Sequence, residues 1–304
     1  MITGGKGAGV RNRAKTPGRE KTPKPRRHPS PGSRALPHGI VVLHEDRDIL
    51  IVDKPPGLLT MGSERNRVRT AYYVLTDYVR KGNPKSRNRV FIVHRLDRET
   101  SGILVFAKSE SAKQSLQGNW ENTQKTYAAV VHGRCKNSSG TISSYLAENA
   151  AHSVYSTPDV QKGKLASTAY KVLKSTDDFS LLEVDLQTGR KHQIRVHLAD
   201  AGFPVVGDSK YGKRGAHKRL ALHAVSLSFA HPFNGRPVSF ETRVPGYFEW
   251  LVSGKAMAGE QGSLASSAKG GVDAASSPSG ERAKGKKAKK HASRRKRPSK
   301  RTRT

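Results

Sequence analysis

The chain has 304 residues, and its 56 Lys and Arg residues outnumber 24 Asp and Glu residues to give a net charge of +32. This excess indicates a polyanionic partner, because each cation that meets a phosphate releases condensed counterions. A single cysteine excludes an internal disulfide and a cysteine-based metal cluster, and no run approaches the roughly 18 apolar residues of a membrane span. The N-terminus lacks the apolar stretch of a secretory signal, so we expect a cytoplasmic protein.

The positive charge is concentrated at both ends. Residues 1–38 are Pro-rich and hold ten Lys or Arg with one acidic residue, while residues 255–304 hold fifteen with three. Such segments bury too little apolar surface to fold, which predicts two disordered basic tails around a folded region at 39–254. The tails alone would fit an ordinary soluble protein equally well, but the middle is also basic and so favours nucleic acid.

Strand-like segments dominate the middle, where β-branched and aromatic residues alternate between Gly, Pro, Asp and Asn. The expected strands are 40–46, 48–54, 89–94, 102–108, 125–133, 167–174, 179–186, 220–229 and 237–244, with a hairpin turn at Thr176–Asp178. The expected helices are 70–81 starting at Thr70, 109–120 with Ser109 as N-cap, and 191–202 ending at Gly202. Many strands with few helices predict an α+β fold with a mostly antiparallel sheet.

The first dense group of reactive residues is a charged loop at 94–101, between two apolar strands that provide a rigid support. Asp97 stands between Arg95 and Arg98, and nearby cations would keep its carboxylate ionised, as a nucleophile or base requires. An Asp in such a loop can equally be a turn former, so the loop alone leaves both readings open.

The second dense group follows a strand that ends at the turn Thr188–Gly189. The helix after it places His192, Gln193 and Arg195 in its first turns, where backbone N–H groups and cations attract phosphate or carboxylate. His192 and His197 are five residues apart and do not share a helix face, so we expect no metal site. The chain also lacks GxSxG, GxxxxGK[ST] and GxGxxG patterns, and nothing calls for a cofactor.

Together these stretches resemble the RluA-type family of RNA pseudouridine synthases. The matching stretches, in the family's order, are VDKPPGL at 52–58, HRLDRETSGILVFAK at 94–108, KTYAAVVHG at 125–133, TGRKHQIRVHLADAGFPVVGDSKYG at 188–212 and LALHAVSLSFAHP at 220–232. The resemblance covers about residues 39–250. Two positions depart from the family pattern, because Asp53 replaces the usual Asn and Lys191 the usual Thr or Ser.

The resemblance implies a mixed, bent sheet with a central active-site cleft, and an isomerase that turns uridine into pseudouridine without cofactor or metal. Many members of the family carry an N-terminal S4 RNA-binding domain, for which the first 38 residues here are too short and too polar. The region 39–254 would be the catalytic domain of a monomer acting on ribosomal RNA, above all of the large subunit, or on tRNA. The target base would be flipped out of its stack. The implied catalytic residues are Asp97, Tyr127 and Arg195, and the implied RNA-binding residues are Arg95, which fills the vacated space, His192 at the pocket border and Leu222 as an apolar wall.

Two other functions stay open at this stage. One is a catalytically silent RNA-binding or ribosome-assembly factor on the same fold, although Asp97, Tyr127 and Arg195 are all present. The other is a glycoside-cleaving enzyme, which requires two carboxylates and for which Glu99 is the nearby candidate.

Overall fold

The computed structural model describes residues 34–62, 68–212, 215 and 217–254. Most of both predicted tails therefore lies outside the described residues. Residues 34–38, predicted as part of the N-terminal tail, belong to the fold instead, since Ala35 forms a β-bridge with Val41 and Leu36 packs against the core. The apolar side chain of Leu36 is enough to attach this segment.

The described part contains a single sheet with a few helices around it. Its strands are β1 (Val41–Glu45), β2 (Ile49–Lys54), β3 (Phe91–Ile92), β4 (Ser101–Ala107), β5 (Gln124–His132), β6 (Ser139–Glu148), β7 (Val154–Thr157), β8 (Lys164–Ser175), β9 (Phe179–Leu186), β10 (Leu222–Ala230) and β11 (Pro237–Glu241). Its helices are α1 (Ala71–Arg80), α2 (Glu110–Gly118), α3 (Gln193–Asp200) and α4 (Gly246–Leu251), with 3-10 turns at Pro37–Gly39 and Trp120–Asn122. No helix of this described part is long and apolar enough to cross a membrane.

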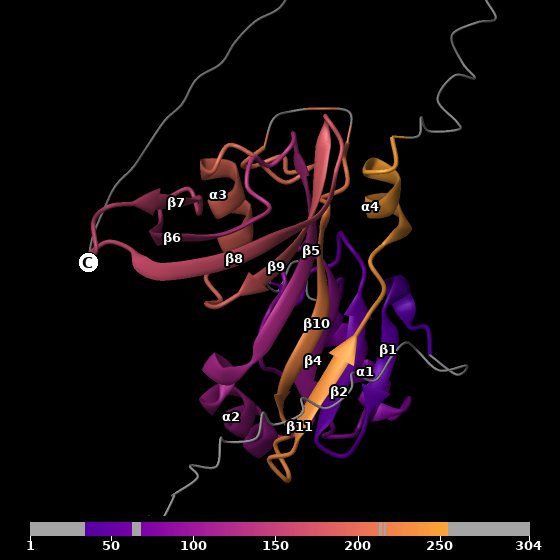
Figure 1. The fold of residues 1–304 in the computed structure, drawn as a ribbon. Coiled ribbons are helices and arrows are strands. Elements are labelled where there is room, and N and C mark those ends of the chain that lie inside the picture. The colour runs from indigo at the N-terminus through magenta and orange to yellow at the C-terminus, as the bar shows by residue number, and fades with distance from the viewer. Residues whose placement is uncertain (1–33, 63–67, 213–214, 216, 255–304) are drawn as a thin grey trace, which may run out of the picture. The chain divides into compact units, whose positions relative to one another are not determined.

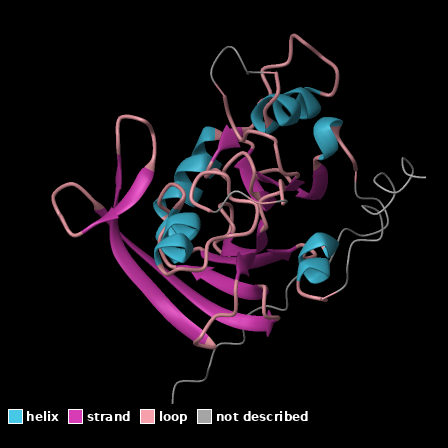
Figure 2. Cartoon of the chain, turned by 90° about the horizontal axis from the view of Figure 1, so that it is seen from above, coloured by secondary structure: helices cyan, strands magenta, loops and turns pink. Residues whose placement is uncertain are grey.

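The strands form one mixed, mostly antiparallel sheet in the order β1-β2-β4-β10-β5-β9-β8-β6-β7, with β11 beside β10 and β3 beside β4. The pair β4–β10 is parallel and the other pairs are antiparallel. Figure 1 shows β6 and β8 running across the direction of β4 and β10, so the sheet is bent. Seen from above, the helices sit at several places around the strands (Figure 2). The expected fold class is confirmed.

The parallel contact between β4 and β10 depends on a glycine. Gly102 pairs with Ala224 and has a φ of +111°, a conformation that side chains other than glycine's rarely adopt. A Cβ atom at this position would lie 2.2 Å from the carbonyl oxygen of Ala224. Glycine is therefore needed both for the conformation and for the close approach of the two strands that flank the site described below.

Two of the three predicted helix starts, at Thr70 and Ser109, are confirmed. The hydroxyl of Thr70 accepts a hydrogen bond from the backbone N–H of Tyr73, and that of Ser109 accepts one from Ala112, both at 3.1 Å. Each hydroxyl satisfies a backbone donor that has no partner within the helix, which is why such residues begin helices.

Several boundaries differ from the prediction. The strand expected at 89–94 is reduced to Phe91–Ile92, because His94 turns to stack on Trp120, with the ring centroids 4.6 Å apart. The third helix begins at Gln193 instead of residue 191, after His192 in a left-handed conformation. Strands β6 and β7 and helix α4 were not predicted. The sequence of β6, SGTISSYLAE, is rich in Ser and Gly and lacks the apolar alternation of the other strands.

Candidate active site

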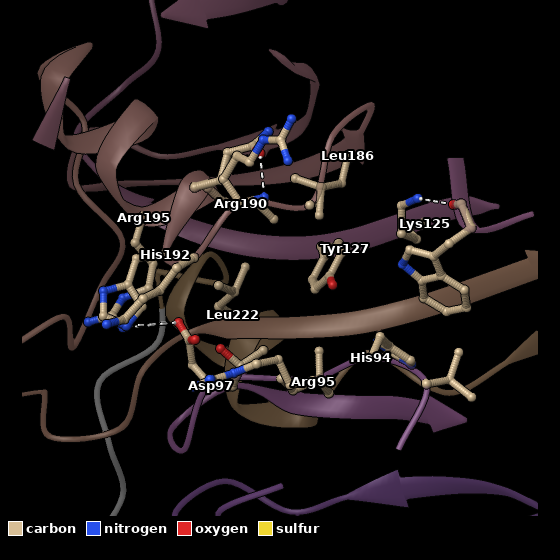
Figure 3. Close-up of a pocket in the computed structure, with 18 residues that line it drawn as sticks. His94, Arg95, Asp97, Lys125, Tyr127, Leu186, Arg190, His192, Arg195 and Leu222 are labelled. Carbon is tan, nitrogen blue, oxygen red and sulfur yellow. Dashed lines mark hydrogen bonds and ion pairs between the residues drawn. The ribbon is translucent and has the colours of Figure 1, made fainter. Parts of the chain in front are cut away.

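A cavity of about 330 Å³ lies at the bend of the sheet. Five segments line it: the loop before β4, the 3-10 turn at Trp120–Asn122, strand β5, the segment from β9 into α3, and the start of β10 (Figure 3). Its described lining comprises Val93, His94, Arg95, Leu96, Asp97, Thr100, Trp120, Lys125, Tyr127, Leu186, Gly189, Arg190, Lys191, His192, Gln193, Ile194, Arg195 and Leu222. The two sequence segments with the densest reactive residues therefore face each other across one cleft.

The centre of this site is an ion-pair chain. The Arg195 guanidinium donates from Nε and Nη2 to the two oxygens of Asp208, at 2.7 and 2.8 Å, and from Nη1 to Oδ2 of Asp97 at 3.2 Å. Asp208 is fully buried and is itself held by the backbone N–H groups of Lys210 and Tyr211. The two-pronged contact with Asp208 fixes the guanidinium plane, so that one N–H is left to point at Asp97.

The electrostatic interaction between Arg195 and Asp208 keeps both side chains ionised. Burial alone would lower the pKa of Arg195, but the hydrogen bonds and charges of Asp208 and Asp97 outweigh it and raise that pKa. Burial likewise would raise the pKa of Asp208, and the contact with Arg195 reverses this and lowers it. Asp208 thus compensates a buried cation and leaves Asp97 as the acid that faces the cavity.

The two oxygens of the Asp97 carboxylate differ in their partners. Its Oδ2 contacts Arg195 at 3.2 Å and Nε2 of His192 at 3.7 Å, whereas Oδ1 has no hydrogen bond or ion pair with any described residue. The cation that pairs with Asp97 is not one of the two that the loop alone suggested. Arg98 pairs with Glu99 at 2.7 Å, and the described residues show no ion pair of Arg95. The distant Arg195 takes their place, because the loop turns both of its own arginines outward, where they are exposed.

His192 is oriented by a tyrosine. Its Nδ1 lies 2.7 Å from the hydroxyl of Tyr211, and that hydroxyl also accepts a hydrogen bond from the backbone N–H of Val154 at 3.0 Å. Burial lowers the pKa of His192, with Arg195 adding to the effect and Asp97 opposing it. A neutral imidazole that accepts at Nδ1 from Tyr211 carries its proton on Nε2, and this N–H faces Asp97.

Tyr127 and Leu222 form the floor of the cavity near Asp97. Both lie between Asp97 and the strands above it in Figure 3, and Leu186 approaches from the other side. Burial and the charge of Asp97 raise the pKa of the Tyr127 phenol, so it stays neutral, and its hydroxyl makes no hydrogen bond to any described residue. The floor thus offers flat, apolar contact beside a carboxylate, which suits a nucleobase.

Cations stand at the rim of the cavity. Arg95 and Arg190 are exposed, and the Arg190 side chain is anchored by a hydrogen bond from Nε to the carbonyl oxygen of Leu165 at 3.2 Å. Lys191 forms an ion pair with Glu148. An apolar floor below a positively charged rim can accept a base inside and phosphates outside.

The far end of the cavity is closed by a stack of side chains. Trp120 lies between the His94 ring, 4.6 Å away, and the ammonium of Lys125, 5.7 Å from its ring centre. Burial lowers the pKa of His94 to about 3, with Lys125 adding to the effect, so the imidazole is neutral and accepts from the backbone N–H of Val105. Burial also lowers the pKa of Lys125. This stack limits the length of the cavity.

The loop that carries Asp97 is held by the end of β2 and the segment after it. Lys54 is fully buried and donates to the carbonyl oxygens of Pro55, Leu58 and Arg98 at 3.0, 2.8 and 3.1 Å. The Thr60 hydroxyl both donates to and accepts from the backbone of Leu96. These contacts fix the loop on both sides of Asp97.

The structure brings all six predicted site residues to one cavity: Asp97, Tyr127, Arg195, Arg95, His192 and Leu222. Sequence reasoning missed the supporting residues Asp208, Tyr211 and Lys54. Asp208 and Tyr211 lie in the quoted stretch GDSKYG, but an aspartate after a glycine looks like an ordinary turn.

Histidines outside the cavity have structural roles. His197 is fully buried and bonds Ser144 and Thr168 at 3.0 and 2.9 Å. Within residues 34–62, 68–212, 215 and 217–254, no group of three or more His, Cys, Asp or Glu side chains is arranged to hold a metal ion.

A bent, mixed sheet with a carboxylate–guanidinium pair in a cation-rimmed central cavity defines an enzyme cleft suited to a nucleic acid. Residues 48–200 match the family described as RNA pseudouridylate synthase. The chain is 38% identical over 216 residues to "Uncharacterized RNA pseudouridine synthase YlyB" of Bacillus subtilis (strain 168), covering 69% of this chain and 71% of that protein. It is 32% identical over 222 residues to "Ribosomal large subunit pseudouridine synthase C" of Vibrio vulnificus (strain CMCP6), covering 70% and 68%.

Solved structures agree on the fold. "Human RNA Pseudouridylate Synthase Domain Containing 1" matches with a TM-score of 0.54 and 26% identity, over 67% of this chain and 83% of that one. "Human RNA Pseudouridylate Synthase Domain Containing 4" matches with a TM-score of 0.57 and 24% identity, over 68% and 90%. The chain belongs to the RNA pseudouridine synthase family, whose enzymes isomerise uridine to pseudouridine.

Proposed function

We propose that this enzyme converts specific uridines of structured RNA, foremost large-subunit ribosomal RNA, with Asp97 as its catalytic carboxylate. The observation that carries the proposal is the asymmetry of Asp97: Arg195 holds Oδ2, while Oδ1 is free of contacts to described residues in the cavity. Breaking the bond between uracil and ribose places positive charge on the sugar, and a fixed carboxylate stabilises that charge. The detached uracil then rotates and rejoins the sugar through C5, which releases its proton, while N1 takes up a proton in place of its lost bond to the sugar.

The other cavity residues take supporting roles in this proposal. Tyr127 stacks on the uracil, Leu222 forms the apolar wall, and His192 contacts Asp97 from the border. Arg95, exposed at the rim, occupies the space that the flipped nucleotide leaves in the RNA. The ribosomal substrate is supported by the net charge of +32 and by relatives named for the large ribosomal subunit.

The two alternative functions fit this geometry less well. A glycoside-cleaving enzyme uses a second carboxylate across the cavity, but Glu99 is bound to Arg98, and Asp97 is the one acid among the described lining residues. A silent RNA-binding factor has no need for a buried Asp208 that fixes Arg195 against Asp97. The products from uridine-labelled RNA separate the three: pseudouridine, free uracil or neither.

The direct test is Asp97→Asn. The amide keeps the shape of the side chain but removes the charge, so pseudouridine formation should fall below about a hundredth of the parent rate while RNA affinity stays within a few fold. The matched control is Glu99→Gln, two residues away and outside the cavity, which should stay near the parent rate. Comparable losses in both variants would refute the assignment, because they would point to the charge of the loop and not to Asp97.

A further inference from the structure

An exposed aromatic ring stands at the end of strand β10 remote from Leu222. Phe233 is 73% exposed and lies in the turn 231–236 between β10 and β11. Strand β10 begins at Leu222 in the cavity and reaches Ala230, so the turn lies roughly 25–30 Å along the strand from the end of the cavity that holds Leu222 and Asp97. Figure 1 shows this turn at the lower end of β10 and β11.

The turn that carries Phe233 is tightly held. Its backbone closes through bonds of 2.8 Å from His231 N–H to the carbonyl of Arg236 and from Gly235 N–H to the carbonyl of His231. The His231 ring accepts from the N–H of Phe233 at Nδ1, 3.3 Å away, and so donates from Nε2 to Asp46, 3.1 Å away. Both nitrogens are used, and the turn is locked to the β1–β2 connection.

Asp46 forms the anchor on that connection. Its Oδ2 also lies 2.9 Å from Nε2 of His44, and its Oδ1 accepts from the backbone N–H groups of Asp48 and Ile49, both at 2.8 Å. These hydrogen bonds all join residues of the fold to one another, yet the Phe233 side chain on the turn that they hold is exposed to solvent. A large apolar ring held rigid and exposed has already lost the conformational freedom that binding would otherwise remove.

Unpaired cations stand beside the ring. A groove of about 530 Å³ runs along the turn and is bordered by Arg47, Arg236 and Phe233. Both arginines are exposed, and neither forms an ion pair with a described residue. Asp48 also borders the groove without an ion pair to a described residue, whereas the carboxylate of Asp46 is engaged in hydrogen bonds with the His44 and His231 rings and with backbone N–H groups. Two arginines without an ion pair to a described residue therefore share the groove with one exposed aromatic ring.

We propose that this turn is a second RNA-contact surface, where Phe233 stacks on an unpaired base and Arg47 and Arg236 contact phosphates of the same strand. The inference rests on the proposed function, which supplies RNA as substrate. Base stacking on an exposed ring between free cations is the usual way in which proteins hold single-stranded RNA. A protein partner fits less well, because charged residues are depleted at the centre of protein interfaces and this groove has one exposed large apolar side chain.

The geometry makes the contact depend on RNA length. A uridine trinucleotide fills the cavity and cannot also reach a turn roughly 25–30 Å away. A fluorescent oligouridylate of about 20 nucleotides can occupy both. Phe233→Leu in the full-length protein keeps an apolar side chain but loses the ring face. It should weaken binding of the long probe by about five-fold or more and leave the trinucleotide unchanged. Phe233→Tyr retains the ring and should match the parent.

The charged residues of the groove provide a second test, in which one variant should weaken RNA binding and another should strengthen it. Arg47→Gln with Arg236→Gln should reduce the slope of log affinity against log salt by about 1.4 for the long probe, since two phosphate contacts are lost. Asp48→Asn removes the one uncompensated carboxylate that borders the groove and should tighten binding. Cross-links from 4-thiouridine in the long probe should map to the peptide that contains residues 231–236, and the trinucleotide should give none there.

Three outcomes overturn the proposal: unchanged long-probe affinity in Phe233→Leu, cross-links confined to the cavity, or a change in sedimentation mass that shows a second copy of the chain as the occupant. Pseudouridine formation by the parent on ribosomal RNA is measured in parallel. If the parent is active while Phe233→Leu binds normally, this inference fails and the proposed function stands. If the parent forms no pseudouridine, the proposed function fails on its own test.

Discussion

Tyr211 decides which nitrogen of His192 carries the proton. Its hydroxyl accepts from Val154 and therefore has its own hydrogen to give to Nδ1 of His192. The proton of the imidazole is left on Nε2, toward Asp97. Without this contact, the opposite tautomer would place a lone pair against the carboxylate, which is electrostatically unfavourable.

Tyr211→Phe should therefore raise the pKa of His192 toward its ordinary value of 6.5, because protonation becomes the favoured way to face Asp97. Pseudouridine formation should fall about tenfold at neutral pH, the equivalent of one hydrogen bond, with the acidic limb of the pH–rate profile moved to higher pH. Titration of the His192 ring by NMR and the rate profile together check this. An unmoved His192 pKa with an equally reduced rate at every pH would show that Tyr211 only supports the backbone at Val154.

At the residue scale, sequence could reach the candidate catalytic groups that line the cavity but not the groups that hold them. Asp97 and Arg195 are 98 positions apart and became a pair only through the family resemblance. The reading of the loop by itself assigned the wrong cations, because adjacency along the chain says little about where side chains point. Asp208 acts through Arg195, and no local pattern marks such a residue.

Between elements, the buried Lys54 ties the end of β2 to the catalytic loop. Burial lowers its pKa to about 8, with Glu99, Asp97 and Asp53 opposing the shift, so it remains mainly charged at neutral pH. Its ammonium group donates to three backbone carbonyl oxygens, and one of them belongs to Arg98, the residue after Asp97. An ammonium with all three donors used is a rigid connection.

Lys54→Met keeps the length of the side chain but leaves those carbonyl oxygens without a donor. We expect kcat to fall at least about tenfold with KM changed little, because loop geometry and not RNA affinity is lost. Amide exchange at residues 96–100 should accelerate. The matched control is Lys108→Met, which removes a lysine bound to Glu45 and the backbone of Asp46 at the other end of β4. Normal kcat in Lys54→Met would remove the positioning role.

Two of the strands that sequence missed are held largely by polar contacts. Strands β6 and β7 lie at the edge of the sheet and meet α3 through hydrogen bonds among Ser144, Ser156 and His197, beside a small apolar cluster of Leu146, Val154, Ala166 and Val196. Packing through polar side chains leaves no hydrophobic periodicity in the sequence from which a strand could be predicted. The strands of the buried centre, β2, β4, β5 and β10, were predicted to within a few residues because their apolar content follows directly from burial on both faces.

For the molecule as a whole, buried neutral histidines predict sensitivity to mild acid. Burial lowers the pKa of His94 to about 3 and of His223 to about 4, and also lowers those of His192 and His197. Below pH 6.5 the unfolded chain binds protons that the folded chain does not, so the stabilisation is complete above 6.5 and is lost as pH falls toward the folded pKa. Each such histidine should lower the free energy of unfolding by up to about 1.4 kcal/mol per pH unit.

Urea unfolding between pH 7 and about pH 5 measures this, above the range in which most carboxylates titrate. We expect a loss on the order of a few kcal/mol and a shallower dependence in His223→Gln, which keeps a polar partner for Ser101 without a titrating ring. A flat profile over this range would contradict the assignment of neutral buried imidazoles.

The positive charge concentrated at both ends of the chain should increase the affinity for RNA. Residues 1–33 carry nine Lys or Arg and one acidic residue, and residues 255–304 carry fifteen and three. Removing both segments should leave pseudouridine formation on saturating RNA within about twofold, raise the RNA concentration needed for half-maximal rate, and make the salt dependence of binding shallower. A folded but inactive trimmed protein at saturation would assign the segments a role in the reaction itself.

The parallel contact at Gly102 has a consequence for the order in which the enzyme becomes competent. Gly102 and its neighbour Ala224 are separated by more than a hundred residues, and the catalytic loop lies directly before that junction. During synthesis, β4 emerges long before β10, and the loop closure that joins them is slow because the intervening chain must first be ordered. Asp97 therefore meets its complete surroundings only once nearly all of the folded region has left the ribosome, and a truncated nascent chain contains Asp97 without the cavity that surrounds it.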